Sequence, residues 1–268
     1  MNNLHRDLAP ISDAAWAQIE EEASRTLKRH LGARRVVDVP EARGIGLAAV
    51  GTGHLRQIPP PSAGIQAAQR EAKALVELRV PFELTRQAID DVERGATDSD
   101  WSAVKEAAKK IAFAEDRCVF DGYAPAEMQG IRQGCSNPTL TLPEHAKDYP
   151  GVVAQAVSRL RLAGVNGPYA LVLGETEYTD LLGGTDDGYP VFHHLERLLD
   201  GGIIPAPSVE GGLVVTTRSG DFELDIGQDI SIGYQGHSST AVQLYFLESF
   251  TFRLLTTEAA VVLSPPKK

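Results

Sequence analysis

The chain has 268 residues, of which 43% are apolar and 23% charged, and its formal net charge is −10 at pH 7. This length and apolar content suffice for one large domain or two small ones with a sizeable core. No window approaches the roughly 18 uninterrupted apolar residues of a membrane span, and the start lacks the basic flank and apolar core of a secretory signal. We therefore expect a cytoplasmic protein without a membrane partner.

The negative charge is concentrated in one part of the chain. Residues 171–230 contain twelve Asp or Glu and two basic residues, while the rest of the chain carries 24 acidic and 24 basic residues. No basic stripe is present to neutralise phosphates, which disfavours a nucleic-acid partner. The acidic region either faces a route for cations or is a solvated surface.

The first 40 residues predict one amphipathic helix followed by a strand. Ser12 is suited to cap the helix and Gly32 to end it, and the strand is RRVVDV at 34–39. Apolar side chains recur on one helix face at three- and four-residue steps: Trp16, Ile19, Ala23, Leu27, His30 and Leu31. We interpret this segment as a docking element; the simpler alternative is a surface helix packed on its own domain.

Residues 41–80 differ in character from the segments around them. They are rich in Gly, Ala and Pro, and they contain two β-like arms around Pro59-Pro60-Pro61. On a monomer such arms would leave many backbone groups unpaired, and pairing with a neighbouring subunit would satisfy these groups. We expect an extended loop.

A long helix is predicted from Asp98 or Ser99, with Trp101 in its first turn, to Tyr123. Within it, Glu115-Asp116-Arg117 is a dense charge cluster. Arg117 would hold the carboxylates ionised, which argues against acid–base catalysis. We interpret the cluster as a structural or intersubunit ion-pair node.

The second half of the chain predicts an α/β module followed by strands. Helices near 151–163, 175–182 and 191–202 alternate with the strand PYALVLG, which is typical of a compact module. Residues 212–263 show the period-two alternation of strands, with turns expected at Ser219-Gly220 and Gln235-Gly236.

No motif for catalysis, metal binding or cofactor binding stands out. GIGLAA at 44–49 has the spacing of a dinucleotide fingerprint, but no helix follows it. His193 and His194 point about 100° apart on a helix, so they do not converge on one metal and are better explained as a pore-lining or surface pair. Cys118 suits a core position and Cys135 a free thiol. We expect a protein that is not an enzyme and has no cofactor.

Several segments spread from Asn2 to Leu263 resemble one family in collinear order. They are NNLHRDLAPIS, DVERG at 91–95, AFAEDRCVFDGY, GPYALVL, DGYP, DFELDIGQDISIGY and LESFTF. The chain thereby resembles the encapsulins, bacterial shell proteins of the linocin type. The resemblance implies an α+β, tailed-phage major-capsid-like (HK97-type) fold with a peripheral domain, an axial domain and an extended loop. The implied ranges are 1–40, 81–129 and 214–268 for the peripheral domain, 41–80 for the loop and 130–213 for the axial domain.

The resemblance also implies a function. Subunits of this kind assemble into an icosahedral nanocompartment, with sixty copies in the smallest case, and retain a cargo enzyme through its C-terminal targeting peptide. The implied cargo is a dye-decolourising peroxidase or a ferritin-like protein. The alternatives are a phage-type capsid protein that packages DNA, and a free-standing bacteriocin or hydrolase.

Two sets of site residues follow from the resemblance. The cargo peptide is expected where the N-terminal helix meets the strand GQDISIGY, at Leu27, Leu31, Arg34, Asp38, Asp229 and Ile230. A pore at a symmetry axis is expected to be lined by Gly183, Gly184, Thr185, Asp186, Asp187 and Gly188, whose glycines permit a tight tip and whose carboxylates would attract cations. The simpler alternatives are a core role for Leu27 and Leu31 and a solvated turn for the loop.

Overall fold

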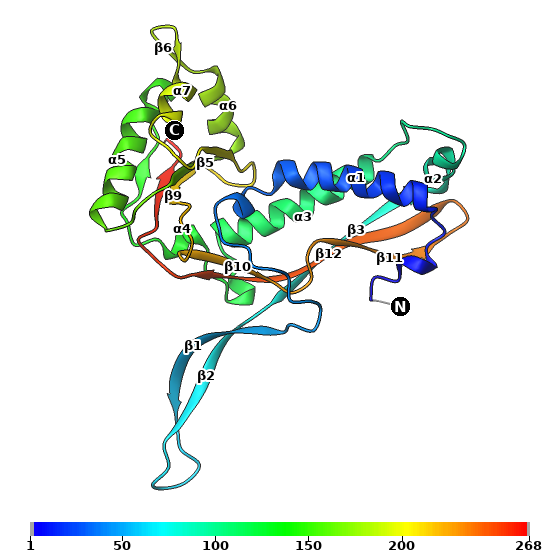
Figure 1. Ribbon diagram of the computed structural model, residues 1–268, viewed down its shortest axis with the longest axis horizontal. Helices are drawn as coiled ribbons and strands as arrows, with labels where there is room; N and C mark the ends of the chain where they lie inside the picture. The colour runs from blue at the N-terminus through cyan, green and yellow to red at the C-terminus, as the bar shows by residue number, and fades with distance from the viewer. Residues whose placement is uncertain (1–2, 267–268) are drawn as a thin grey trace.

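The computed structural model describes residues 3–266, so the outermost residues of the expected ranges 1–40 and 214–268, including Asn2 of the first resembling segment, lie outside the described residues. Figure 1 shows two long helices lying over a sheet, an α/β module at one end and a hairpin that projects away from both. The combination of helix and sheet confirms the predicted α+β class. No helix among the described residues has the length and apolarity needed to span a membrane.

Helix α1 (Asp13–His30) carries the predicted cap. The Ser12 hydroxyl accepts a hydrogen bond from the Ala15 N–H at 3.3 Å. The helix ends at His30, two residues before the expected stop. The strand predicted at 34–39 is wrong: the chain forms a 3-10 turn, η2 (Ala33–Arg35), and only Asp38 makes an isolated bridge to Glu223.

Helix α3 (Ser102–Phe120) packs beneath α1 and runs in the same direction, and it is shorter than predicted. It begins at Ser102 because the Asp100 carboxylate accepts a hydrogen bond from the Ser102 N–H at 2.9 Å, which fixes a turn before the helix. Trp101 therefore occupies the cap position and not the first turn. Helix α2 (Arg86–Glu93), capped by the Thr85 hydroxyl, was not predicted.

The two helices cover a four-stranded antiparallel sheet. Its long strand β12 (Ala241–Leu254) pairs with β10 (Phe222–Ile226), β11 (Ser231–His237) and β3 (Val76–Thr85). The turn predicted at Gln235-Gly236 is wrong, because the register shifts there as a bulge within β11 and the chain reverses after His237. Apolar side chains of α1, α2, α3, β3, β11 and β12 form one core beneath the helices.

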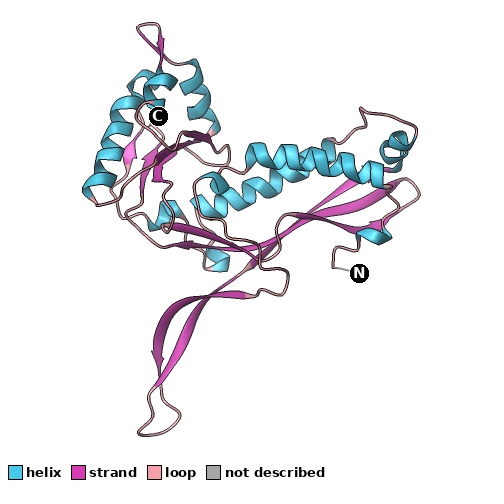
Figure 2. Cartoon of the chain, in the orientation of Figure 1, coloured by secondary structure: helices cyan, strands magenta, loops and turns pink. Residues whose placement is uncertain are grey.

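The projecting hairpin consists of β1 (Ala49–Ile58) and β2 (Ala67–Ala74), which pair antiparallel on either side of the proline turn. Figure 2 shows that this hairpin extends away from the rest of the chain. Nearly all of its side chains are exposed. The expectation of two β arms is confirmed. Residues 76–80, which the expected range 41–80 included, belong instead to β3 of the main sheet.

The α/β module is built on a five-stranded sheet in the order β4-β13-β9-β5-β8. Its strands are β4 (Leu140–Thr141), β5 (Tyr169–Leu173), β8 (Ile203–Pro205), β9 (Gly212–Thr216) and β13 (Ala260–Ser264), and its helices are α4 (Ile131–Gly134), α5 (Tyr149–Leu162), α6 (Glu175–Gly183) and α7 (Val191–Glu196). The sequence interpretation grouped β9 and β13 with the other C-terminal strands. Both lie in this second sheet because their side chains are almost entirely buried and need cover on both faces.

The module ends in a small hairpin of β6 (Thr185–Asp186) and β7 (Tyr189–Pro190). Asp187 and Gly188 form its two-residue turn, with φ of 48° and 82°. Positive φ at both positions is typical of the tight turns that join two strands, and Gly and Asp tolerate it best. Figure 1 shows this hairpin at the extremity of the module.

Candidate functional site

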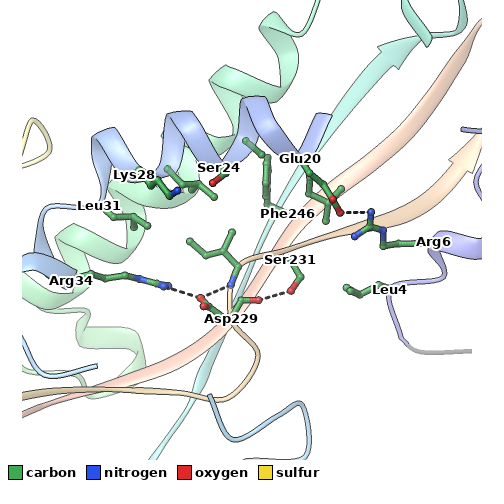
Figure 3. A pocket seen from close by; sticks show the side chains of 14 residues that line it. Leu4, Arg6, Glu20, Ser24, Lys28, Leu31, Arg34, Asp229, Ser231 and Phe246 are labelled. Carbon is green, nitrogen blue, oxygen red and sulfur yellow. Dashed lines mark hydrogen bonds and ion pairs between the residues drawn. The ribbon is translucent and has the colours of Figure 1, made fainter. Parts of the chain in front are cut away.

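A groove of about 460 Å³ runs between α1 and β11; we call it the α1–β11 groove (Figure 3). It is lined by Leu4, Arg6, Glu20, Ala23, Ser24, Leu27, Lys28, Leu31, Arg34, Asp229, Ile230, Ser231, Ile232 and Phe246. The α1 residues share one helix face because their spacing follows the 3.6-residue turn. The β11 residues reach the groove because the strand starts beneath the end of α1.

The floor of the groove is apolar. Ala23, Ile232 and Phe246 are buried, and Leu27 and Ile230 are partly buried against the same core. Leu27 therefore contributes to packing, and both Leu27 and Leu31 present surface to the groove. When an apolar side chain covers this floor, apolar surface is removed from water and the free energy falls.

Each end of the groove carries an ion pair. Arg6 Nη2 lies 2.5 Å from Glu20 Oε1, and the Arg6 guanidinium lies over the Trp16 ring at 4.2 Å. At the other end, Arg34 Nη1 lies 2.8 Å from Asp229 Oδ1. These groups offer donors and acceptors to a bound chain at both ends of an apolar floor (Figure 3).

Two fully buried carboxylates hold Arg34 in place on the side that faces away from the groove. Its guanidinium nitrogen Nη2 lies 2.6 Å from Glu115 Oε2 and 2.6 Å from Glu248 Oε1. Burial, followed by the charge of Glu115, raises the pKa of Glu248 well above its ordinary value. The cluster fixes the direction of the guanidinium toward the groove, since its other nitrogens are occupied.

The neighbouring Asp116 joins α3 to the turn after α1. Its carboxylate accepts hydrogen bonds from the N–H groups of Gly32 at 3.0 Å and Ala33 at 2.8 Å. Burial raises the pKa of Asp116 to about 7, against the lowering effect of the Ala33 hydrogen bond. The predicted ion-pair node is therefore present within the chain. Its cation is Arg34 and not Arg117, which is exposed.

Five of the six residues predicted for the cargo site line this groove, and Asp38 does not. The Asp38 carboxylate accepts a hydrogen bond from the Gly220 N–H at 2.6 Å, and its backbone pairs with Phe222 and Leu224. The prediction that Asp38 lies at the groove assumed a strand at residues 34–39, and this strand does not form. Sequence reasoning missed Arg6, Glu20, Ser24, Lys28 and Phe246; the helix spacing of Glu20, Ser24 and Lys28 with Leu27 and Leu31 was the available signal.

The residues predicted for the pore lie together at the end of the module. Asp186 and Asp187 are exposed in the β6–β7 hairpin. At its base, the Tyr189 ring contacts the His194 ring at 4.8 Å between centroids, and His193 Nδ1 lies 2.8 Å from Glu196 Oε2. Both histidines are exposed. Within residues 3–266, no three His, Cys, Asp or Glu side chains are arranged to hold a metal ion.

Solved structures place this fold among the shells of viruses. The chain matches a virus-like particle protein of Pyrococcus furiosus with a TM-score of 0.67 and 16% identity, covering 93% of this chain and 99% of that one. It also matches a chain of Mycobacterium phage Adephagia with a TM-score of 0.58 and 14% identity, covering 89% and 91%. At these identities the match shows the fold alone, and it confirms the predicted tailed-phage major-capsid-like architecture.

Curated relatives narrow this class to one family. The chain is 57% identical to a type 1 encapsulin shell protein of Rhodococcus erythropolis and 55% identical to one of Mycobacterium tuberculosis, each over 98% of this chain and 100% of the relative. Residues 1–251 match the model of the family described as "encapsulating protein for peroxidase". The chain belongs to this encapsulin family. It is a structural shell protein and not an enzyme, as the sequence predicted.

Proposed function

We propose that identical copies of this chain close into an icosahedral shell and retain a cargo protein whose C-terminal peptide binds the α1–β11 groove. The observation that carries this proposal is the groove itself, with its apolar floor between two charged ends. An extended peptide fits such a surface because alternate side chains enter the floor while the charged ends fix its direction. The rigid Arg34 cluster reduces the ordering cost of binding.

The projecting hairpin supports assembly into a closed shell. Nearly all side chains of β1 and β2 are exposed, and within the described residues these strands pair only with each other. Contact with a neighbouring copy would cover this surface. Closed symmetry makes such a head-to-tail contact finite, and the smallest icosahedral shell contains sixty copies.

The cargo we propose is a peroxidase, because the description of the family names one. A dye-decolourising haem peroxidase is the first candidate and a ferritin-like protein the second. Such a compartment would reside in the cytoplasm with its cargo. The β6–β7 hairpin would line a pore at a symmetry axis and admit the small substrates of the cargo.

A matched pair of substitutions tests the groove. Ser24 is an exposed, small residue inside the groove, and Ala14 is an exposed, small residue on the same helix outside it. Ser24→Trp fills the groove, whereas Ala14→Trp leaves it open. Shells are purified from a host that expresses the native cargo, and the ratio of cargo to shell protein is measured by mass spectrometry and haem absorbance.

We expect megadalton particles from both variants, at least tenfold less cargo in Ser24→Trp, and wild-type cargo in Ala14→Trp. A haem Soret band would identify a peroxidase, and iron loading without haem would identify a ferritin-like cargo. Equal cargo in the two variants would remove the groove from the proposal. A species near the 28.8 kDa chain mass, or particles that contain nucleic acid in place of protein cargo, would contradict the proposed function as a whole.

A further inference from the structure

A second pocket, of about 390 Å³, lies between α1 and α3; we call it the α1–α3 pocket. Most of the residues that line it are charged: Glu22, Arg25, Thr26, Arg29, His30, Lys105, Glu106 and Lys109. None of these residues lines the α1–β11 groove, because they lie on a different face of α1. Figure 1 shows the two helices packed against each other along their length.

Two rows of cations face each other across this pocket. Each row holds two basic side chains one helical turn apart: Arg25 and Arg29 on α1, Lys105 and Lys109 on α3. The rows lie opposite each other because the two helices run in the same direction and are held in register. Glu22 Oε1 lies 3.9 Å from Lys105 Nζ at one end, and the ring centroids of His30 and Phe113 are 5.4 Å apart at the other.

The carboxylates of the pocket neutralise only part of this charge. Glu22 is buried and pairs with Arg25. Glu106 is exposed and makes no ion pair or hydrogen bond among the described residues. Arg29 and Lys109 likewise have no carboxylate partner within residues 3–266. Four cations and two carboxylates line the pocket, which leaves a surplus of two positive charges.

Helix stability does not explain these positions. Residues of like charge four positions apart on a helix repel each other, and each helix carries such a pair at the pocket. Basic residues complement the dipole in the last turn of α1, but Lys105 lies in the first turn of α3, where positive charge is unfavourable. The arrangement therefore lowers the stability of the free protein, and a bound anion would offset this loss.

His30 lines the pocket, and its Nδ1 atom is buried without a hydrogen-bond partner in the described part of the chain. Burial, followed by the charges of Lys109 and Arg29, lowers the pKa of His30. The charge of Glu175, from α6, acts in the opposite direction and has the smallest effect. A proton on Nδ1 would lack an acceptor, so the neutral ring carries its proton on Nε2. Nε2 is not enclosed in this way, and its N–H is free to donate into the pocket.

We propose that the α1–α3 pocket binds a phosphate group, either free or carried on a small molecule. A phosphate dianion matches the surplus of two positive charges, whereas a carboxylate or a chloride ion supplies only one charge. The Arg29 guanidinium would donate to two phosphate oxygens, and Lys109 and the His30 Nε2–H would donate to the others. Arg25 and Lys105 would attract the anion from the rim. This site goes beyond the proposed cargo function and does not depend on it.

Two double variants with the same net charge test this site. Arg29→Gln with Lys109→Gln removes two donors from the pocket. Arg35→Gln with Lys110→Gln removes one Arg and one Lys that are exposed and lie outside it, and is the matched control. The melting temperature of each purified protein is measured against the concentration of inorganic phosphate and of glycerol 3-phosphate, at constant ionic strength with chloride as the reference.

We expect both probes to stabilise the wild type and the control to the same extent. The apparent affinity should be at least tenfold lower in the pocket variant, because charged hydrogen bonds to the anion are lost. General salting-out by phosphate acts on the pocket variant and the control alike, so the difference between them reports the site. Tighter binding of glycerol 3-phosphate than of phosphate would identify an esterified ligand, and equal binding would show that the phosphate group alone is recognised.

The pocket variant has a second expected effect, which separates loss of the ligand from misfolding. Without added anion it should melt above the wild type, because the repulsion within each row has been removed. If the double variant does not fold, Arg29→Gln alone, at an exposed position, should still lower the affinity severalfold. The proposal would be overturned by a wild type that neither probe stabilises beyond chloride, or by equal stabilisation of the pocket variant and the control.

Discussion

At the residue scale, Arg34 organises the end of the α1–β11 groove. One guanidinium contacts Glu115, Glu248 and Asp229, and the first two are fully buried. Burial, followed by the charge of the neighbouring Glu115, raises the pKa of Glu248 well above its ordinary value. The cluster therefore keeps a proton at a pH where isolated carboxylates lose theirs.

Stability should consequently depend on pH between about 4 and 7. The pKa of Glu248 and that of Asp116 are both raised on folding, the latter to about 7. Between the unfolded value near 4 and the folded value, the folded chain binds more protons than the unfolded chain. The contribution of these groups is therefore complete below the unfolded pKa and is lost as pH rises through the folded pKa.

Glu248→Gln tests this dependence. Glutamine keeps the shape of the side chain but does not titrate, so the fall in melting temperature from pH 5 to 7.5 should be smaller than in the wild type. Glu106→Gln, on the exposed face of α3, should follow the wild type. An unchanged slope in Glu248→Gln would show that the buried carboxyl does not titrate in this range.

At the scale of elements, β11 and β12 are held together by close packing across a glycine. The Tyr245 ring of β12 covers Gly233 of β11, and the Arg79 guanidinium of β3 lies over the same ring at 3.6 Å. The Tyr245 hydroxyl donates a hydrogen bond to the Asn3 carbonyl at 3.3 Å. The glycine thus lets one ring join three strands and the N-terminal segment.

We expect Gly233→Ala to lower the free energy of unfolding by about 1–3 kcal/mol, because the new Cβ would meet the Tyr245 ring at 2.2 Å and displace it. Gly236→Ala is the matched control in the same strand, since its Cβ would find no atom closer than 3.6 Å. Thermal unfolding of the two variants compares them directly. An equal loss of unfolding free energy in the two variants would indicate that glycine flexibility, and not the ring contact, matters in β11.

At the scale of the whole molecule, the acidic surplus has a particular location. The segment 171–230, which accounts for the net charge of −10, runs through most of the α/β module and includes the β6–β7 hairpin. If identical hairpins surround a symmetry axis, their exposed Asp186 and Asp187 form a ring that concentrates cations.

Changing Asp186 and Asp187 to Asn should therefore slow the entry of a small cation into intact shells severalfold and leave a neutral solute of equal size unaffected. Asn tolerates the positive φ of residue 187, so the hairpin keeps its shape. Cation entry is followed by stopped-flow fluorescence of a chelating dye trapped inside. Asp200→Asn removes an exposed carboxylate outside the hairpin and is the control. Unchanged cation flux in the Asn variant would leave the acidic pair without a role in permeation.

Most elements could be predicted from the sequence because their signals are local. The cap at Ser12, the apolar face of α1 and the alternation in the last strands each depend on residues within a few positions of one another. The expectation of a peptide site on α1, at Leu27 and Leu31, followed from the resemblance to the family. The collinear segments identified the family, and with it the fold.

Tertiary structure alone decided which distant residues meet. Arg34 contacts Glu115 and Glu248, which lie 81 and 214 positions away in the chain, and no periodicity connects them. Asp38 lies outside the expected site because its backbone pairs with β10. Strand β13 lies in the second sheet because its buried side chains need cover on both faces. These outcomes depend on the burial of apolar surface and on the pairing of polar groups across the whole chain, whereas sequence periodicity reports only which face of an element is apolar.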